Sequence, residues 1–189
     1  QTNAIPFDTA VPSDSYQDLM PLKAIIGDAR IVSLGESTHG TREFFQMKHR
    51  LISFLVQEMG FNVVAMEASW PYSRAVNAYI QDGTGNAEEV VRNMGFWTWD
   101  TEEVVDMVSW LRQYNANVNE TEQVQFAGFD VQLHNPAVDQ IITFLEQVDP
   151  DAGSEIVPNL QCVRRLNNYV SWTPLEIETC QAALQTVYD

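Results

Sequence analysis

Basic residues are scarce in the 189-residue sequence. It carries 10 Lys and Arg against 26 Asp and Glu, so its formal net charge is −16. Proteins that bind nucleic acid or anionic membranes need basic patches, so we expect neither partner. No apolar run reaches the roughly 18–20 residues that a transmembrane helix needs. These absences exclude classes of partner without identifying a substrate.

Several motifs of cofactor and metal chemistry are also missing. The sequence has no Walker sequence, no GxGxxG and no HExxH, and we expect no cofactor. Cys162 and Cys180 lie in no metal-binding spacing, although the two could pair. If residues 176–184 form a helix, Cys180 is a small core residue. Cysteine usage and charge fit a cytoplasmic and an exported location about equally, and we favour the cytoplasm slightly.

The composition is that of a globular protein. Apolar residues make up 45% and charged residues 19% of the chain, which excludes disorder. The length suits one domain, which we place at residues 21–189. Residues 1–20 contain Pro6, Pro12 and three aspartates with little periodicity, so we expect an arm that lies on the surface.

The hydrophobic pattern predicts strands alternating with helices. Strands are expected at 31–34, 62–66 and 124–129, and helices at 42–59, 72–81, 87–93, 100–114 and 136–148, with one or two more after Pro150. Gly60 should cap the helix before it, and Asp100 with Glu103 has the spacing of a capping box. The expected fold is α/β, a parallel sheet built from βαβ units with helices on both faces.

Polar side chains follow each predicted strand. Because sites in open α/β sheets form beyond the carboxyl ends of the strands, we expect these groups to meet there. The groups are Glu36, His39 and Arg42 after the first strand, Glu67 and Trp70 after the second, and Asp130 and His134 after the third.

His39 is the main candidate among them. It lies between Gly35 and Gly40, just before a predicted helix N-terminus, where the helix dipole disfavours a positive ring. A carboxylate from Glu36 or Glu67 beside it would fix the tautomer. This combination suits a general base, while the alternative is a histidine that only caps the turn.

The other candidates are weaker. His49 lies in the middle of a predicted helix and is better explained as a core histidine, whereas His134 follows the third strand and can reach the site. Ser37 lacks the GxSxG context of a nucleophile elbow. A metal site is a further alternative without supporting spacing, and its ligands would be His39, His134, Glu36, Glu67 and Asp130.

Several blocks, in order, resemble the erythromycin esterase family. They are LGESTHGTREFF at 34–45, AMEASW at 65–70, RAVNAY at 74–79, FWTW at 96–99, EEV at 102–104, WLR at 110–112 and AGFDVQ at 127–132. Members are longer, and their later half supplies another active-site histidine, so the chain looks like the N-terminal part of the family domain, a short or truncated form.

The resemblance implies a hydrolase that opens a cyclic ester with activated water and without a serine intermediate. His39 would be the general base, oriented by Glu36 and Glu67. The ester substrate, a macrolide antibiotic for some members, would be held by Arg42, Arg74, Trp70, Trp97, Trp99, Asp130 and His134. A binding module without catalysis and a metal-dependent hydrolase are the alternatives, and the oligomeric state is open.

Overall fold

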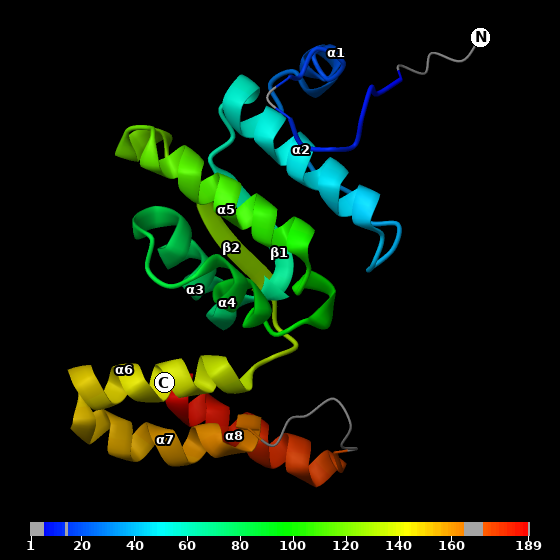
Figure 1. Cartoon of the computed structure of the whole chain (residues 1–189). Coiled ribbons are helices and arrows are strands. Elements are labelled where there is room, and N and C mark those ends of the chain that lie inside the picture. Colours follow the sequence, from blue (N-terminus) through cyan, green and yellow to red (C-terminus); the bar gives the residue numbers. More distant parts are fainter. Residues whose placement is uncertain (1–5, 14, 165–171, 189) are drawn as a thin grey trace. The chain divides into compact units, whose positions relative to one another are not determined.

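A computed structural model describes residues 6–13, 15–164 and 172–188 (Figure 1). The chain divides into two compact units. One contains Gln1–Ala68 and Tyr72–Gly128, and the other contains Ser69–Pro71 and Phe129–Asp189. The expectation of a surface arm followed by one domain at 21–189 stays a prediction.

The first unit surrounds two paired strands with helices (Figure 1). Strands β1 (Val63–Ser69) and β2 (Gln125–Asp130) are neighbours in a small parallel sheet. Between them the chain runs through three α-helices and two short 3-10 helices. The remaining elements are α1 (Pro21–Ile26), α2 (Arg42–Met59), α3 (Trp70–Asp82), α4 (Ala87–Arg92), η1 (Trp97–Trp99), α5 (Glu102–Ala116) and η2 (Glu120–Glu122).

The strand expected at 31–34 is wrong, since these residues form no ladder with β1 or β2. A strand needs a hydrogen-bonded neighbour and, in a central position, cover on both faces. Ile31 is largely exposed, so the apolar run lacks both conditions. The predicted βαβ unit that begins at this strand is therefore not formed in the described residues, and the helix α1 before it was not expected.

Helix α2 has the predicted bounds and the predicted cap. Its apolar side chains recur at helical spacing, and Gly60 takes a left-handed conformation with φ of 73°. Because glycine has no Cβ, it adopts this conformation without the steric strain that other residues would meet. The helix therefore ends where the glycine stands.

Helix α5 has a different cap from the one predicted. Thr101 is the N-cap, and its hydroxyl accepts a hydrogen bond from the Val104 N–H at 3.3 Å. Asp100 is instead the residue that ends η1, and its backbone N–H bonds the Trp97 carbonyl. The expected capping box of Asp100 and Glu103 is therefore wrong, which leaves the Glu103 carboxylate available for another contact.

The core of the first unit lies between the sheet and helices α2 to α5. Asn115 of α5 is a buried polar member of it. Its amide donates to the carbonyls of Ile80 at 3.0 Å and Val124 at 2.8 Å, and its side-chain oxygen accepts from the Val124 N–H. Asn115 thus joins α5 to the end of α3 and to the chain entering β2.

The described part of residues 1–20 packs on α2. Tyr16 lies edge-on to the Phe54 ring, with centroids 5.9 Å apart, and Leu19 is fully buried in the same cluster. The guanidinium of Arg50 binds the Asp18 carboxylate with both terminal nitrogens and also donates to the carbonyls of Thr9 and Ser15. These contacts fasten the segment to α2.

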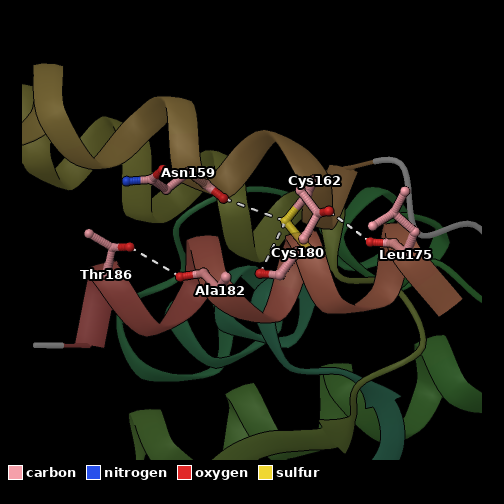
Figure 2. Close-up of a disulfide and its surroundings, with 7 residues drawn as sticks. Asn159, Cys162, Leu175, Cys180, Ala182 and Thr186 are labelled. Carbon is pink, nitrogen blue, oxygen red and sulfur yellow. Dashed lines mark hydrogen bonds between the residues drawn. A yellow bond between two sulfur atoms is a disulfide. The ribbon is translucent and has the colours of Figure 1, made fainter.

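The described residues of the second unit form mainly three helices, α6 (Asn135–Val148), α7 (Pro150–Arg164) and α8 (Pro174–Tyr188). Figure 2 shows the disulfide between Cys162 of α7 and Cys180 of α8. The two cysteines therefore pair. Arg164 also forms an ion pair with Asp139 of α6. In the part of the chain that the structure describes, no helix is long and apolar enough to cross a membrane.

Candidate active site

The loop before α2 brings His39 and Glu36 together. Nδ1 of His39 meets Oε1 of Glu36, three residues earlier in the chain. The other carboxylate oxygen of Glu36 lies 3.7 Å from Nζ of Lys48, on α2. Glu36 therefore stands between a histidine and a lysine, both of which stabilise its negative charge.

This pairing determines what the His39 ring can do. A neutral imidazole that donates Nδ1–H to a carboxylate keeps its lone pair on Nε2. The side chain of His39 is 56% exposed, so more than half of its surface can contact water or a ligand. The geometry thus matches a histidine oriented by a carboxylate, which is the arrangement of a general base.

Arg42, the first residue of α2, is held by a partner on another helix. Its Nε lies 2.9 Å from Oε1 of Glu103, in the first turn of α5, and the Glu103 side chain is largely buried. An arginine bound through Nε can still present its two terminal nitrogens. The ion pair with Glu103 thus holds the exposed guanidinium of Arg42 against α5.

The short helix η1 contacts both the His39 loop and β1. The Thr98 hydroxyl donates to the His39 carbonyl at 2.7 Å, and the indole N–H of Trp99 donates to the Glu67 carbonyl at 2.9 Å. The Trp97 and His39 rings lie edge-to-face with centroids 6.5 Å apart. Trp97 is 77% exposed, while Trp99 is 4% exposed and belongs to the core.

The remaining predicted site residues lie on other elements of the chain. Glu67 is exposed near the end of β1 and Arg74 is exposed on α3. Within the described residues, the His39 ring is paired with Glu36, and the His39 carbonyl accepts a hydrogen bond from Thr98. Trp70, Asp130 and His134 belong to the second unit, so their part in the same site stays a prediction. Asp130 accepts from the backbone and side chain of Gln132.

His49 differs from His39 in its burial and in its hydrogen bonding. It is buried against the Trp110 ring on α5, and its Nε2 has no hydrogen-bond partner among the described residues. Burial lowers the pKa of His49 to about 4, and the nearby charge of Asp106 opposes this shift only in part. His49 is thus neutral near pH 7. Its burial agrees with the predicted structural histidine, whereas an Nε2 without a partner among the described residues was not expected.

This shift predicts an acid-sensitive contribution to stability. Because the folded pKa lies below the unfolded value of about 6.5, the unfolded chain takes up the proton first. The contribution of neutral His49 to the free energy of unfolding, roughly 3 kcal/mol, is complete above pH 6.5 and is lost as the pH falls towards 4. We expect His49→Leu to gain stability relative to the wild type over this interval. Urea unfolding at pH 7, 5.5 and 4.5 measures this, and parallel profiles for the two proteins would contradict it.

Three residues of this arrangement were not found from the sequence. They are Lys48, Thr98 and Glu103. A signal exists for Lys48, because it lies seven residues, about two helical turns, after the N-cap Thr41, and helical side chains point back towards the N-terminus. Thr98 and Glu103 lie about 60 residues from their partners in the chain, and only the fold shows these contacts.

A metal site finds no support in the geometry of the described ranges. No group of three His, Cys, Asp or Glu side chains in 6–13, 15–164 and 172–188 is arranged to hold a metal ion.

Fold and site together define an α/β protein with a carboxylate-oriented histidine. A family model described as erythromycin esterase matches residues 56–189, which is well over half of the chain. The protein therefore belongs to the erythromycin esterase family. The block that carries His39 lies before the matched range.

Known relatives agree with this membership. The chain is 33% identical to erythromycin esterase type II of Escherichia coli over 78% of its length, and 29% identical to the putative hydrolase YbfO of Bacillus subtilis over 80%. It covers 35% and 32% of these two proteins. The chain thus spans about a third of the length of both.

Solved structures show the same fold. A crystal structure of a succinoglycan biosynthesis protein is 35% identical to this chain, with a TM-score of 0.82. A Bacillus cereus protein is 32% identical, with a TM-score of 0.76. Both similarities cover 97% of this chain, and 47% and 45% of the respective structures.

Proposed function

We propose that this chain carries the base of a hydrolase that cleaves a carboxylic ester or lactone with activated water. The observation behind the proposal is the His39–Glu36 pair, in which Nδ1 is bound to a carboxylate and the ring is exposed. Family membership supports hydrolysis as the reaction class. The substrate class, a macrocyclic lactone or another ester, is part of the proposal.

The proposed reaction begins with proton transfer from water to Nε2 of His39 as the water oxygen attacks the ester carbonyl carbon. The carbonyl electron pair moves to oxygen and forms an oxyanion, while Glu36 stabilises the imidazolium. The oxyanion then collapses and the carbon–oxygen bond to the alcohol breaks. The leaving alkoxide takes the proton from His39, which restores the base and releases an acid and an alcohol.

Arg42 is the proposed electrophilic partner. Glu103 binds its Nε, which leaves the terminal N–H groups to donate to the carbonyl oxygen as negative charge develops there. Glu67 and Arg74 are proposed to orient the water and to contact substrate. Trp97, with its exposed ring near His39, offers an apolar surface for the ester.

A binding module without turnover is the second candidate. The observation behind it is the exposed Trp97 ring beside His39, which can contact an apolar ligand without any turnover. In that case, the same exposed ring and loop bind an apolar ester without releasing product. Binding that is unchanged in His39→Ala, with no product formed, would favour this candidate.

The experiment is mass spectrometry of a panel of macrolides and simpler lactones after incubation with the 189-residue chain. Hydrolysis adds one water to the substrate mass. Ser37→Ala serves as the matched control, because it removes the serine considered from the sequence as a nucleophile and should leave the product unchanged. Loss of product in Ser37→Ala would overturn the proposed mechanism, and a panel without hydrolysis counts against turnover by this chain.

A further inference from the structure

The loop that carries His39 has no regular secondary structure to hold it. Residues 31–41 form neither helix nor strand, so no ladder or helical hydrogen bond fixes the backbone at His39. A general base must stay within a fraction of an ångström of its working position, because small displacements reduce catalysis strongly. The position of His39 therefore depends on contacts from elsewhere in the first unit.

One such contact comes from Thr98. Its hydroxyl donates to the His39 carbonyl oxygen at 2.7 Å, across 59 residues of sequence. Thr98 is buried, so its hydroxyl has little access to water, and loss of its partner would be costly. This bond acts on the backbone of His39, whereas Glu36 acts on its ring.

The residues on either side of Thr98 explain why it can serve as an anchor. Trp99 is buried in the core, where it packs against Phe45 of α2 and donates its indole N–H to the Glu67 carbonyl. Trp97 lies on the other side with its ring edge-to-face with His39. Three consecutive residues thus join the core, the end of β1 and the His39 loop.

We propose that η1 is a positioning element of the active site, in which Thr98 holds the backbone of His39 and Trp99 holds η1 against β1. The proposal rests on the proposed function for its effect on turnover. It assigns Trp99 to support of the site, whereas Trp97 keeps the role of a substrate contact. Thr98 is a positioning residue because it acts only through His39.

Two substitutions separate the hydroxyl from the bulk of the side chain. Thr98→Val removes the donor and keeps the shape, while Thr98→Ser keeps the donor and removes a methyl group. Thr98→Ala takes the place of the valine variant if the latter does not fold. Asn86→Ala is the control for general destabilisation, because it removes the side-chain cap of α4 without a contact to His39.

The first measurement does not depend on activity. Backbone ¹⁵N relaxation of the full chain should give order parameters near 0.85 for residues 36–41 in the wild type, in Thr98→Ser and in Asn86→Ala. In Thr98→Val they should fall below about 0.6, while α5 keeps its values. Unchanged order parameters for residues 36–41 in Thr98→Val would overturn the proposal.

The second measurement uses any ester that the chain hydrolyses. Thr98→Val should lower kcat roughly tenfold or more with KM within about threefold, and Thr98→Ser should restore most of it. An equal kcat in the valine variant and the wild type overturns the positioning role. If His39→Ala keeps full activity, the proposed function fails, and the relaxation data alone then decide whether η1 positions the loop.

Discussion

His39→Ala should lower the turnover of an ester substrate by about 10²–10⁴-fold, the usual contribution of a general base. The alanine variant keeps the backbone bond from Thr98, because that bond goes to the carbonyl of residue 39. It leaves Glu36 with Lys48 as a partner. The loss should therefore appear in kcat, and the fold should persist.

The control for this experiment is His49, which lies on α2. His49 is buried, and burial lowers its pKa to about 4, so it takes no part in proton transfer near pH 7. His49→Leu should keep nearly full turnover. Mass spectrometry of the lactone and its hydrolysed product under single-turnover conditions gives both rates. A loss below about tenfold in His39→Ala would remove His39 from the role of base.

The sequence predicted most helices of the first unit because their signals are local. Helix α2 is defined by apolar residues at helical spacing and by a glycine that accepts a positive φ. The helix expected from residue 100 is present as α5, but its N-cap is Thr101 and not Asp100. Adjacent cap candidates differ only in backbone conformation, which a single sequence does not specify.

The strand expected at 31–34 failed for a non-local reason. Four apolar or small residues before a glycine are compatible with a strand, but pairing depends on what lies beside them. In the described residues the ladder joins β1 to β2 only. A local pattern reports the propensity to extend and does not report whether a neighbour is present.

The same distinction between local signals and contacts of distant segments applies to the candidate site. Glu36 was one of two carboxylates, with Glu67, expected beside His39, and it lies three positions earlier in the same loop. The support of His39 from Thr98 and the binding of Arg42 by Glu103 depend on which distant segments pack together. The chemical groups of the candidate site thus lie in motifs visible in the sequence, whereas the contacts from Thr98 and Glu103 depend on the fold.

Arg50→Met should lower the free energy of unfolding by about 3–5 kcal/mol, the cost of breaking a buried ion pair. Arg50 and Asp18 have side chains that are 2% and 6% exposed. The methionine fills most of the space but cannot donate, so the Asp18 carboxylate loses its counter-charge. The carbonyls of Thr9 and Ser15 lose a donor as well.

The exposed ion pair of Lys23 and Glu58 provides the matched control. Its atoms are 2.7 Å apart, but both side chains are 36% exposed. Water and salt screen such a pair, so Lys23→Met should cost less than about 1 kcal/mol. Urea unfolding of the two variants and the wild type at pH 7 tests the contrast. Equal small losses in both variants would show that burial of the Arg50 pair adds nothing.

The pH dependence of the same contrast is a stricter test. The hydrogen bond from Arg50 holds the pKa of Asp18 well below its usual range, so the unfolded chain binds this proton more readily than the folded chain. The contribution of the pair is complete above the unfolded pKa of about 3.9 and is lost as the pH falls through the folded value. The difference in the free energy of unfolding between wild type and Arg50→Met should therefore shrink below pH 4.

The ion pair joins the segment before α1 to the middle of α2, so its loss should free that segment first. Amide exchange of residues 15–20 should therefore rise more than that of α5.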